Sequence, residues 1–127
     1  MSKGSRSKNT ATFPFQNQNG KDFLMLHLQI IDLPNSTFTA NREYDEFAVR
    51  HYERYCNDQL RARGHLMLND VLNLFGLKRI KMGYRYGWLM ISGKPLNNQL
   101  VEIKLGDIRP SHIELLIYSA GDIWDLL

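Results

Sequence analysis

A long amphipathic segment near the middle of the chain constrains the fold most strongly. Residues 41–63 have the spacing of one helix, with Thr39 or Asn41 as its N-cap and Gly64 placed to end it. At 100° per residue, one face collects aromatic and small side chains: Tyr44, Phe47, Ala48, His51, Tyr52, Tyr55 and Ala62. Polar side chains lie opposite: Glu46, Arg50, Glu53, Asn57 and Arg61. We expect the aromatic face to pack on the core and the polar face to meet water.

Shorter apolar segments surround this helix. Residues 22–33 alternate as a strand, whose expected core side holds Leu24, Leu26, Leu28 and Ile30. A second, shorter helix follows the long one, with Asn69 as its natural N-cap and Gly76 at its end. Three strands in a meander come next: 87–92, 99–105 and 112–120. This order, β-α-α-β-β-β, predicts an α+β domain with one long and one short helix packed on one face of a small antiparallel sheet.

The N-terminal residues differ in composition from the rest. Residues 1–21 are rich in Ser, Asn, Thr, Gln, Lys and Gly and show no periodicity. We therefore expect a flexible basic and polar arm, 1–21, followed by a single domain, 22–127. Phe13 and Phe15 interrupt the polar composition, which suggests that they anchor the arm either on its own domain or on a partner.

The charge is concentrated in two places. Residues 1–22 account for the whole net charge of +3, so the remaining residues are neutral as a group. Within them, the stretch 78–94 holds cations without an acidic residue: Lys78, Arg79, Lys81, Arg85 and Lys94. Three interpretations stay open for this stretch: a glycine-rich turn with incidental charge, a nucleic-acid surface on which Tyr84 or Tyr86 stacks on bases, or a contact for an acidic protein.

Several functional classes do not fit this sequence. No apolar run approaches the roughly 20 residues that a membrane helix needs, and the N-terminus has no apolar signal core. A single cysteine, Cys56, cannot form an internal disulfide, which fits a reducing cytoplasm. The four histidines lack the spacing of a metal-binding motif, so we expect neither a metal nor a cofactor.

Catalysis has two candidate centres, both of them weak. His51, Tyr55 and Asp58 could form an acid–base cluster beside the long helix, although a buried polar network explains the same residues. Cys56 as a nucleophile would need a base, and His51 points about 140° away from it on the helix. We therefore expect a protein that is not an enzyme and a cysteine that is a plain buried or half-buried thiol.

One sequence pattern spans the end of the helical region and the strand after it. A polar helix is followed by Leu-x-Leu-Asn-x-Val, Gly-Leu, a basic linker, and two glycines, the second preceding a tryptophan. The matching positions are Leu66, Leu68, Asn69, Val71, Gly76, Leu77, Gly83, Gly87 and Trp88. The stretch 43–88 thereby resembles a family of small, uncharacterised proteins from bacteriophages and related mobile elements of Gram-positive hosts. The resemblance implies a short meander of strands afterwards, with an ending like that of 121–125, and a phage context without a mechanism.

These observations predict a non-enzymatic, phage-encoded module that binds a host or phage protein. It would act as a virion or assembly component, or as an inhibitor of a host defence factor, in the bacterial cytoplasm or the virion and away from membranes. The residues expected at the contact are Phe13, Phe15, Lys78, Arg79, Lys81, Tyr84 and Arg85. The alternative is a nucleic-acid-binding module that uses the basic stretch 78–94 and the N-terminal arm.

Overall fold

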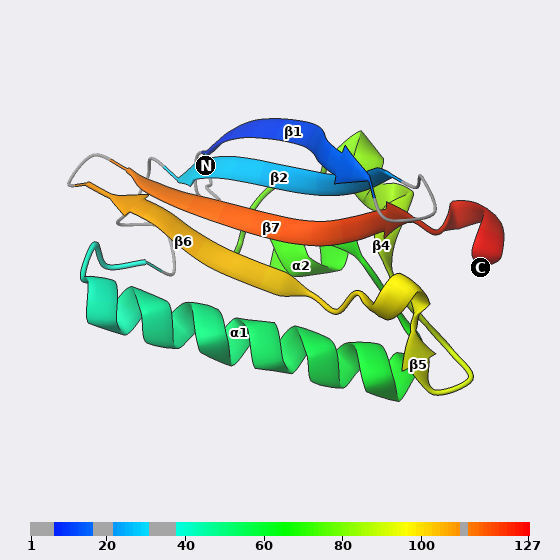
Figure 1. Ribbon diagram of the computed structural model, residues 1–127. Helices are drawn as coiled ribbons and strands as arrows, with labels where there is room; N and C mark the ends of the chain where they lie inside the picture. Colours follow the sequence, from blue (N-terminus) through cyan, green and yellow to red (C-terminus); the bar gives the residue numbers. More distant parts are fainter. Residues whose placement is uncertain (1–6, 17–21, 31–37, 110–111) are drawn as a thin grey trace.

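The computed structural model describes residues 7–16, 22–30, 38–109 and 112–127. The strands of these ranges join in one antiparallel sheet (Figure 1): β1 (Ser7–Gln16), β2 (Asp22–Ile30), β3 (His65–Met67), β4 (Tyr86–Ile91), β5 (Lys94–Pro95), β6 (Glu102–Ile108) and β7 (Ile113–Asp122). Two helices pack on the sheet: α1 (Arg42–Arg63) and α2 (Leu68–Leu74). Short 3₁₀ turns complete the chain: η2 (Lys81–Tyr84), η3 (Leu96–Asn98) and η4 (Trp124–Leu126). The predicted α+β class is confirmed.

Strand β7 organises the sheet, because it has different partners along its length. One edge pairs with β2, and the other pairs first with β6 and then, at Gly121 and Asp122, with β4. The change of partner falls next to Ser119, which is buried and has a left-handed φ of 74°. The expected simple meander is therefore wrong in one respect: β4 pairs with β3, β5 and β7, and no ladder joins it to β6 in the described ranges.

The N-terminal segment contributes a strand of its own. Composition predicts a flexible arm over 1–21, but residues 7–16 form β1, which pairs with β2 and has an irregularity between Thr12 and Phe15. Residues 1–6 and 17–21 lie outside the described residues, as do residues 31–33 at the end of the expected strand. Phe13 and Phe15 belong to β1, so the backbone of this part of the arm lies on its own domain, which is one of the alternatives that the sequence leaves open.

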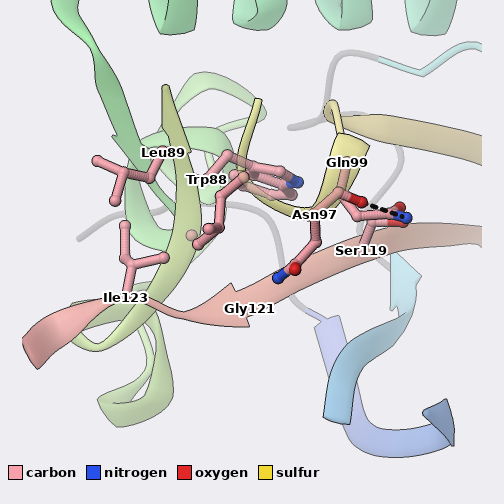
Figure 2. Close-up of a pocket in the computed structure, with 9 residues that line it drawn as sticks. Trp88, Leu89, Asn97, Gln99, Ser119, Gly121 and Ile123 are labelled. Atoms are coloured by element: carbon pink, nitrogen blue, oxygen red, sulfur yellow. Dashed lines mark hydrogen bonds between the residues drawn. The ribbon is translucent and has the colours of Figure 1, made fainter. Parts of the chain in front are cut away.

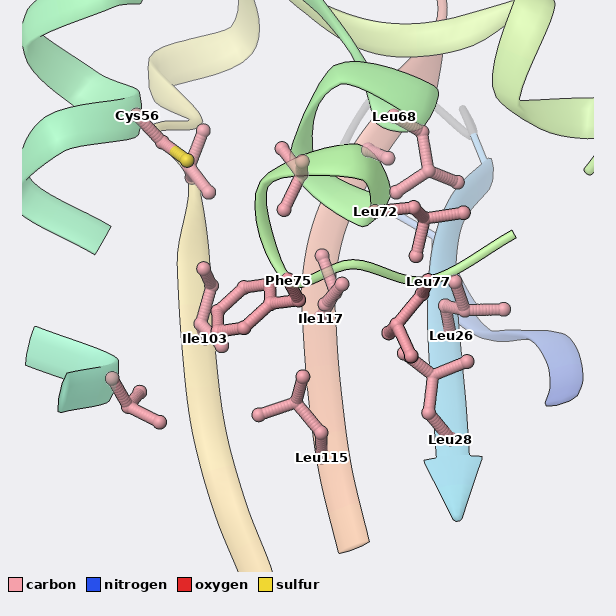
Figure 3. Close-up of a cluster of buried hydrophobic side chains, with 14 of the residues drawn as sticks. Leu26, Leu28, Cys56, Leu68, Leu72, Phe75, Leu77, Ile103, Leu115 and Ile117 are labelled. Carbon is pink, nitrogen blue, oxygen red and sulfur yellow. The ribbon is translucent and has the colours of Figure 1, made fainter. Parts of the chain in front are cut away.

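The hydrophobic core fills the space between the two helices and the sheet. From β2 it receives Leu26, Leu28 and Ile30, which are buried as the alternation predicts, while the side chain of Leu24 lies outside the description. Phe75, which follows α2, is central to this core. It stacks on Phe38 with ring centroids 5.8 Å apart, and the ring of Tyr52 from α1 meets it edge-on at 4.9 Å. Figure 3 shows the side chain of Phe75 among residues of the sheet and helices: Cys56, Leu72, Ile103 and Ile117.

Helix α1 has the predicted limits but is rotated about its axis relative to the predicted orientation. Its N-cap is Asn41, whose side chain accepts a hydrogen bond from the Tyr44 N–H at 3.2 Å, and Gly64 ends it with a φ of 86°. The buried side of α1 carries Asp45, Val49, Cys56 and Leu60. The expected core face is instead exposed: Phe47 is 75% and Tyr44 is 71% accessible, and His51 is also exposed. The prediction that the aromatic face packs on the core is therefore wrong for these residues, and among the aromatic members of that face Tyr52 is the one that packs on the core, against Phe75.

The reason for this orientation lies at the edge of β6, beside which α1 runs (Figure 1). Asn57 donates to the Val101 carbonyl at 3.1 Å and accepts from the Val101 N–H at 2.9 Å. One turn earlier, Glu53 accepts from the Ile103 N–H at 2.8 Å, and Arg50 donates to the Ile103 carbonyl. The polar face of α1 therefore pairs backbone groups that an open strand edge would leave to water or to another chain.

Candidate interaction surface

Asn69 fixes the backbone of the basic stretch. The expectation that it caps the second helix is wrong, because α2 begins at Leu68 and Asp70 accepts the Met67 N–H at 3.0 Å. The Asn69 side chain is instead buried, and it makes two bonds to Ile80, eleven residues later. Its amide nitrogen donates to the Ile80 carbonyl at 3.0 Å, and its oxygen accepts the Ile80 N–H at 2.9 Å. The backbone N–H and C=O of Ile80, which lies inside the basic stretch, are thus both bonded to the side chain of Asn69.

Two glycines allow close approaches of the backbone, one to Asn69 and one to strand β3. A Cβ added at Gly83 would lie 2.0 Å from the Asn69 side-chain oxygen. A Cβ added at Gly87 would lie 2.2 Å from the carbonyl oxygen of Leu66, in the neighbouring strand β3. Real Cβ atoms do not approach other atoms so closely, so each position accepts only glycine without movement of its neighbours.

The remaining pattern positions are structural as well. The apolar ones are buried: Leu66, Leu68, Val71, Leu77 and Trp88. Gly76 has a φ of 74° where the chain leaves α2, and the Leu77 N–H that follows returns to the Leu72 carbonyl at 2.9 Å. The pattern noted in the sequence therefore describes a structural scaffold. Between Leu77 and Gly87, this scaffold leaves the cations of the basic stretch exposed.

The predicted contact residues of this stretch lie on the surface. Lys78, Arg79 and Lys81 are exposed, and none of them forms an ion pair with another residue of the described ranges. Tyr84, in η2, is 56% accessible. The backbone that carries these side chains is fixed by the contacts of Asn69 with Ile80 and Gly83. A partner that binds them would therefore not have to order a flexible loop.

Arg85 differs from the other cations of the stretch. Its Nε lies 2.7 Å from an Asp122 carboxylate oxygen, and a terminal nitrogen lies 3.6 Å from Asp125. The hydrogen bond and the charge of Asp122 raise the pKa of the Arg85 guanidinium further above its ordinary value. The Arg85 carbonyl also accepts the Ile123 N–H at 3.1 Å. Arg85 thus joins the basic stretch to the C-terminal residues and is already paired within the fold.

This junction brings a residue to the surface that the sequence analysis did not select. Trp124 is 56% accessible, and it directly follows Ile123, the residue bonded to Arg85. Tyr84 directly precedes Arg85, so two exposed aromatic side chains flank the same hydrogen bond. The signal available in the sequence was the ending at residues 121–125, which was noted only as part of a resemblance.

Phe13 and Phe15, the other predicted contact residues, belong to β1. Their side chains lie outside the described part of the structure, so the structure does not join them to the basic stretch.

A small cavity lies behind β4, where the indole of Trp88 extends toward Asn97 and Gln99 (Figure 2). Its volume is about 20 Å³, and the Trp88 Nε1 finds no acceptor within the described part of the chain. Asn97 and Ser119 line it with left-handed φ values of 57° and 74°. A cavity of this size suits one water molecule rather than a substrate.

The catalytic candidates are not assembled into a site. Burial first, and then the charges of Glu53 and Asp70, raise the pKa of the Cys56 thiol to about 12, so it stays protonated at neutral pH. The buried thiol expected from the sequence is confirmed. His51 is exposed and its ring lies against that of Tyr52 at 5.6 Å, so the expected buried network around it is wrong.

Two further features of the described residues bear on metal binding and on membranes. Among the residues that the structure describes, no group of three or more His, Cys, Asp or Glu side chains is placed to hold a metal ion. In the same ranges, none of the helices combines the length and the apolar character needed to cross a membrane.

Comparison with known families identifies the class to which this scaffold belongs. Residues 6–116 match the model of a family of unknown function, DUF6353, and the chain therefore belongs to that family. The matched region begins one residue before β1 and includes both helices and the basic stretch, whereas Trp124 lies beyond it. No curated protein and no solved structure matches the chain.

Proposed function

We propose that this chain is a non-enzymatic, phage-encoded module that binds a host or phage protein through its basic stretch. One observation supports the proposal: Asn69 fixes the backbone of this segment through two hydrogen bonds to Ile80, and the segment carries four exposed side chains, Lys78, Arg79, Lys81 and Tyr84. Rigid display lowers the entropic cost of binding, which favours a preorganised recognition surface over an incidental turn.

The chemistry around the stretch favours a protein over a phosphate backbone. Asp122 and Asp125 place two carboxylates around Arg85, in the middle of the stretch, and these would repel a continuous line of phosphates. Tyr84 and Trp124 beside them are of the residue types enriched at protein interfaces. An acidic protein surface with an apolar part would complement this mixture of lysine, arginine and aromatic groups.

The biological setting of the proposal comes from the resemblance of residues 43–88 to small phage and mobile-element proteins. In that setting the partner is either another virion or assembly component or a host defence factor that the module inhibits, in the bacterial cytoplasm or the virion. Phe13 and Phe15 in β1 are a second contact in this proposal.

The test compares two variants with the same change of charge. Lys78→Glu/Arg79→Glu alters the proposed surface, and Lys104→Glu/Arg109→Glu alters exposed cations on another part of the sheet. A partner captured from infected cells is identified, purified and titrated with each variant. We expect a loss of affinity of at least about 10-fold for the first variant and less than about 2-fold for the second. Equal binding by both variants would overturn the proposed surface.

Nucleic acid remains the second candidate, because Lys78, Arg79 and Lys81 are exposed and not engaged in ion pairs of the described residues. A salt titration with a generic duplex and a single strand separates the two candidates. Three phosphate contacts would give a slope of log K against log salt near about −2 to −3. We expect no binding at low salt; a steep slope that Lys78→Ala/Arg79→Ala/Lys81→Ala removes would instead establish the nucleic-acid function.

A further inference from the structure

The outward face of α1 carries three exposed aromatic side chains, and it lies apart from the basic stretch. Phe47 is 75%, Tyr44 71% and Tyr55 46% accessible, and His51 lies exposed between them along the helix. Exposed aromatic groups on a common face are costly to leave in water, and they mark sites of protein contact.

Rotation of the helix cannot bury these groups within the same chain. Val49, Cys56 and Leu60 hold one side of α1 in the core. Asn57 and Glu53 bind the edge of β6 on the adjoining side. The aromatic face is therefore turned outward as long as these contacts exist, and the described residues of the chain leave Tyr44, Phe47 and Tyr55 exposed on it.

The charges beside the aromatic groups indicate which molecule this is. Glu43, Phe47, Arg54 and Arg61 follow one another at spacings of four, seven and seven residues, so they form one line along the helix. An adjacent line holds Tyr44, Ala48, His51 and Tyr55. The first line is acidic at its N-terminal end and basic at its C-terminal end, and all four of its residues are exposed.

We propose that α1 pairs in antiparallel orientation with α1 of a second copy of this chain, with the two-fold axis near His51. The midpoint of Glu43 and Arg61 falls at residue 52, and that of Phe47 and Arg54 falls between residues 50 and 51. A two-fold axis at this level brings Glu43 opposite the partner's Arg61, and Phe47 opposite the partner's Arg54. Each contact occurs twice: an ion pair, and a cation over an aromatic ring.

Other occupants fit this pattern less well. A parallel pair of helices would place Glu43 beside the partner's Glu43 and Arg61 beside the partner's Arg61, which repel each other. An unrelated partner would require no match between the two ends of the same helix. The two midpoints differ by about 1.5 residues, or roughly 2 Å along the helix axis, an offset that long Glu and Arg side chains can span across a self-complementary surface.

The first test is the mass of the full chain in solution. Sedimentation or light scattering over a range of concentrations should show a rise from 14.8 kDa to twice that value. Phe47→Ser should leave the mass at that of one chain over the same range. Leu126→Ser, which removes an exposed apolar group outside α1, should leave the association unchanged. A wild-type mass of one chain at all concentrations up to the millimolar range, or association that survives Phe47→Ser, overturns the proposal.

The second test separates antiparallel pairing from other modes of association. Glu43→Arg and Arg61→Glu each create two like-charge contacts per dimer, so each should raise the dissociation constant by about 10-fold. Glu43→Arg/Arg61→Glu in the same chain restores opposite charges and should return the constant to within about 3-fold of the wild type. Failure of the double variant to recover overturns the antiparallel arrangement. Circular dichroism of each variant checks that α1 itself is intact, since Arg61 also lies 3.8 Å from Asp58.

Discussion

Residues 65–88 and helix α1 place the same kinds of side chain in opposite environments. In 65–88 the apolar residues are inside: Leu66, Leu68, Val71, Leu72 and Trp88 are buried, and the cations are outside. In α1 the aromatic residues Tyr44, Phe47 and Tyr55 are outside, and Glu53 and Asn57 point at the protein. The comparison shows that hydrophobicity predicts orientation where the neighbour is an apolar face, and fails where the neighbour is the edge of a sheet.

The edge of β6 explains this failure in physical terms. Backbone N–H and C=O groups at a strand edge need partners, and a helix can supply them only through polar side chains. Asn57 provides one donor and one acceptor to Val101, which is the pairing that a neighbouring strand would provide. Apolar atoms of α1 are still buried, but they come from smaller residues: Val49, Cys56 and Leu60.

The reactivity of Cys56 gives the largest contrast between the two possible orientations of α1. With the aromatic face inside, Cys56 would point away from the core; in the structure it is 2% accessible. A pKa raised from 9.0 to about 12 lowers the thiolate fraction at pH 8 by roughly 1,000-fold. We expect alkylation of the native protein to be slower than that of the unfolded chain by at least this factor. Similar rates in the two states would contradict the orientation described here.

In residues 65–88, Gly87→Ala should produce the largest loss of stability. The added Cβ would meet the Leu66 carbonyl oxygen at 2.2 Å, and a paired backbone cannot move aside as a side chain can. We expect a loss of about 3 kcal/mol in the free energy of unfolding, measured by urea titration. Gly93→Ala is the matched control: it has open space but a φ of 79°, so strain alone should cost about 1 kcal/mol. Equal losses would show that the close approach to β3 is not required.

Asn69→Ala should cost slightly less, because it removes hydrogen bonds without adding a clash. Both the N–H and the C=O of Ile80 would lose their partner, and we expect a loss of about 2 to 3 kcal/mol. Asn73→Ala, on the exposed side of the same helix, should change stability by less than about 0.5 kcal/mol. Hydrogen exchange at Ile80 is the direct measurement: its amide should lose protection in Asn69→Ala and keep it in Asn73→Ala.

The sequence predicts what depends on neighbouring residues and misses what depends on distant ones. The sequence predicts Gly64 and Gly76 at helix ends and Asn41 as one of two possible N-caps, and all three lie at helix ends, because capping is decided within a few residues. Asn69 has the composition of a cap, and its true partner is eleven residues away. Arg85 looked free because Asp122, its partner, is separated from it by 37 residues. The change of partner along β7 likewise follows from long-range pairing that no local pattern specifies.

The polar side of α1 can be tested by Asn57→Ala. This variant leaves the N–H and C=O of Val101 without their bonds of 2.9 and 3.1 Å, but alanine is the better helix former. We expect a net loss of about 1 to 2 kcal/mol. Asp58→Ala, at the next position and facing water, should be within about 0.5 kcal/mol of the wild type. If Asn57→Ala is equally harmless, the edge of β6 does not determine the orientation of the helix.

Phe47→Ser should have the smallest effect on the free energy of unfolding, although it replaces a large apolar residue by a polar one. Phe47 is 75% accessible, so the change should stay within about 0.5 kcal/mol when it is measured at protein concentrations too low for self-association. Val49→Ser, two positions along, empties a fully buried site and introduces a hydroxyl, at a cost of about 3 kcal/mol. The ratio of the two effects identifies the face of α1 that meets the core. A larger loss for Phe47→Ser than for Val49→Ser would return the helix to the orientation that its aromatic pattern predicts, and would remove the surface proposed for the antiparallel dimer.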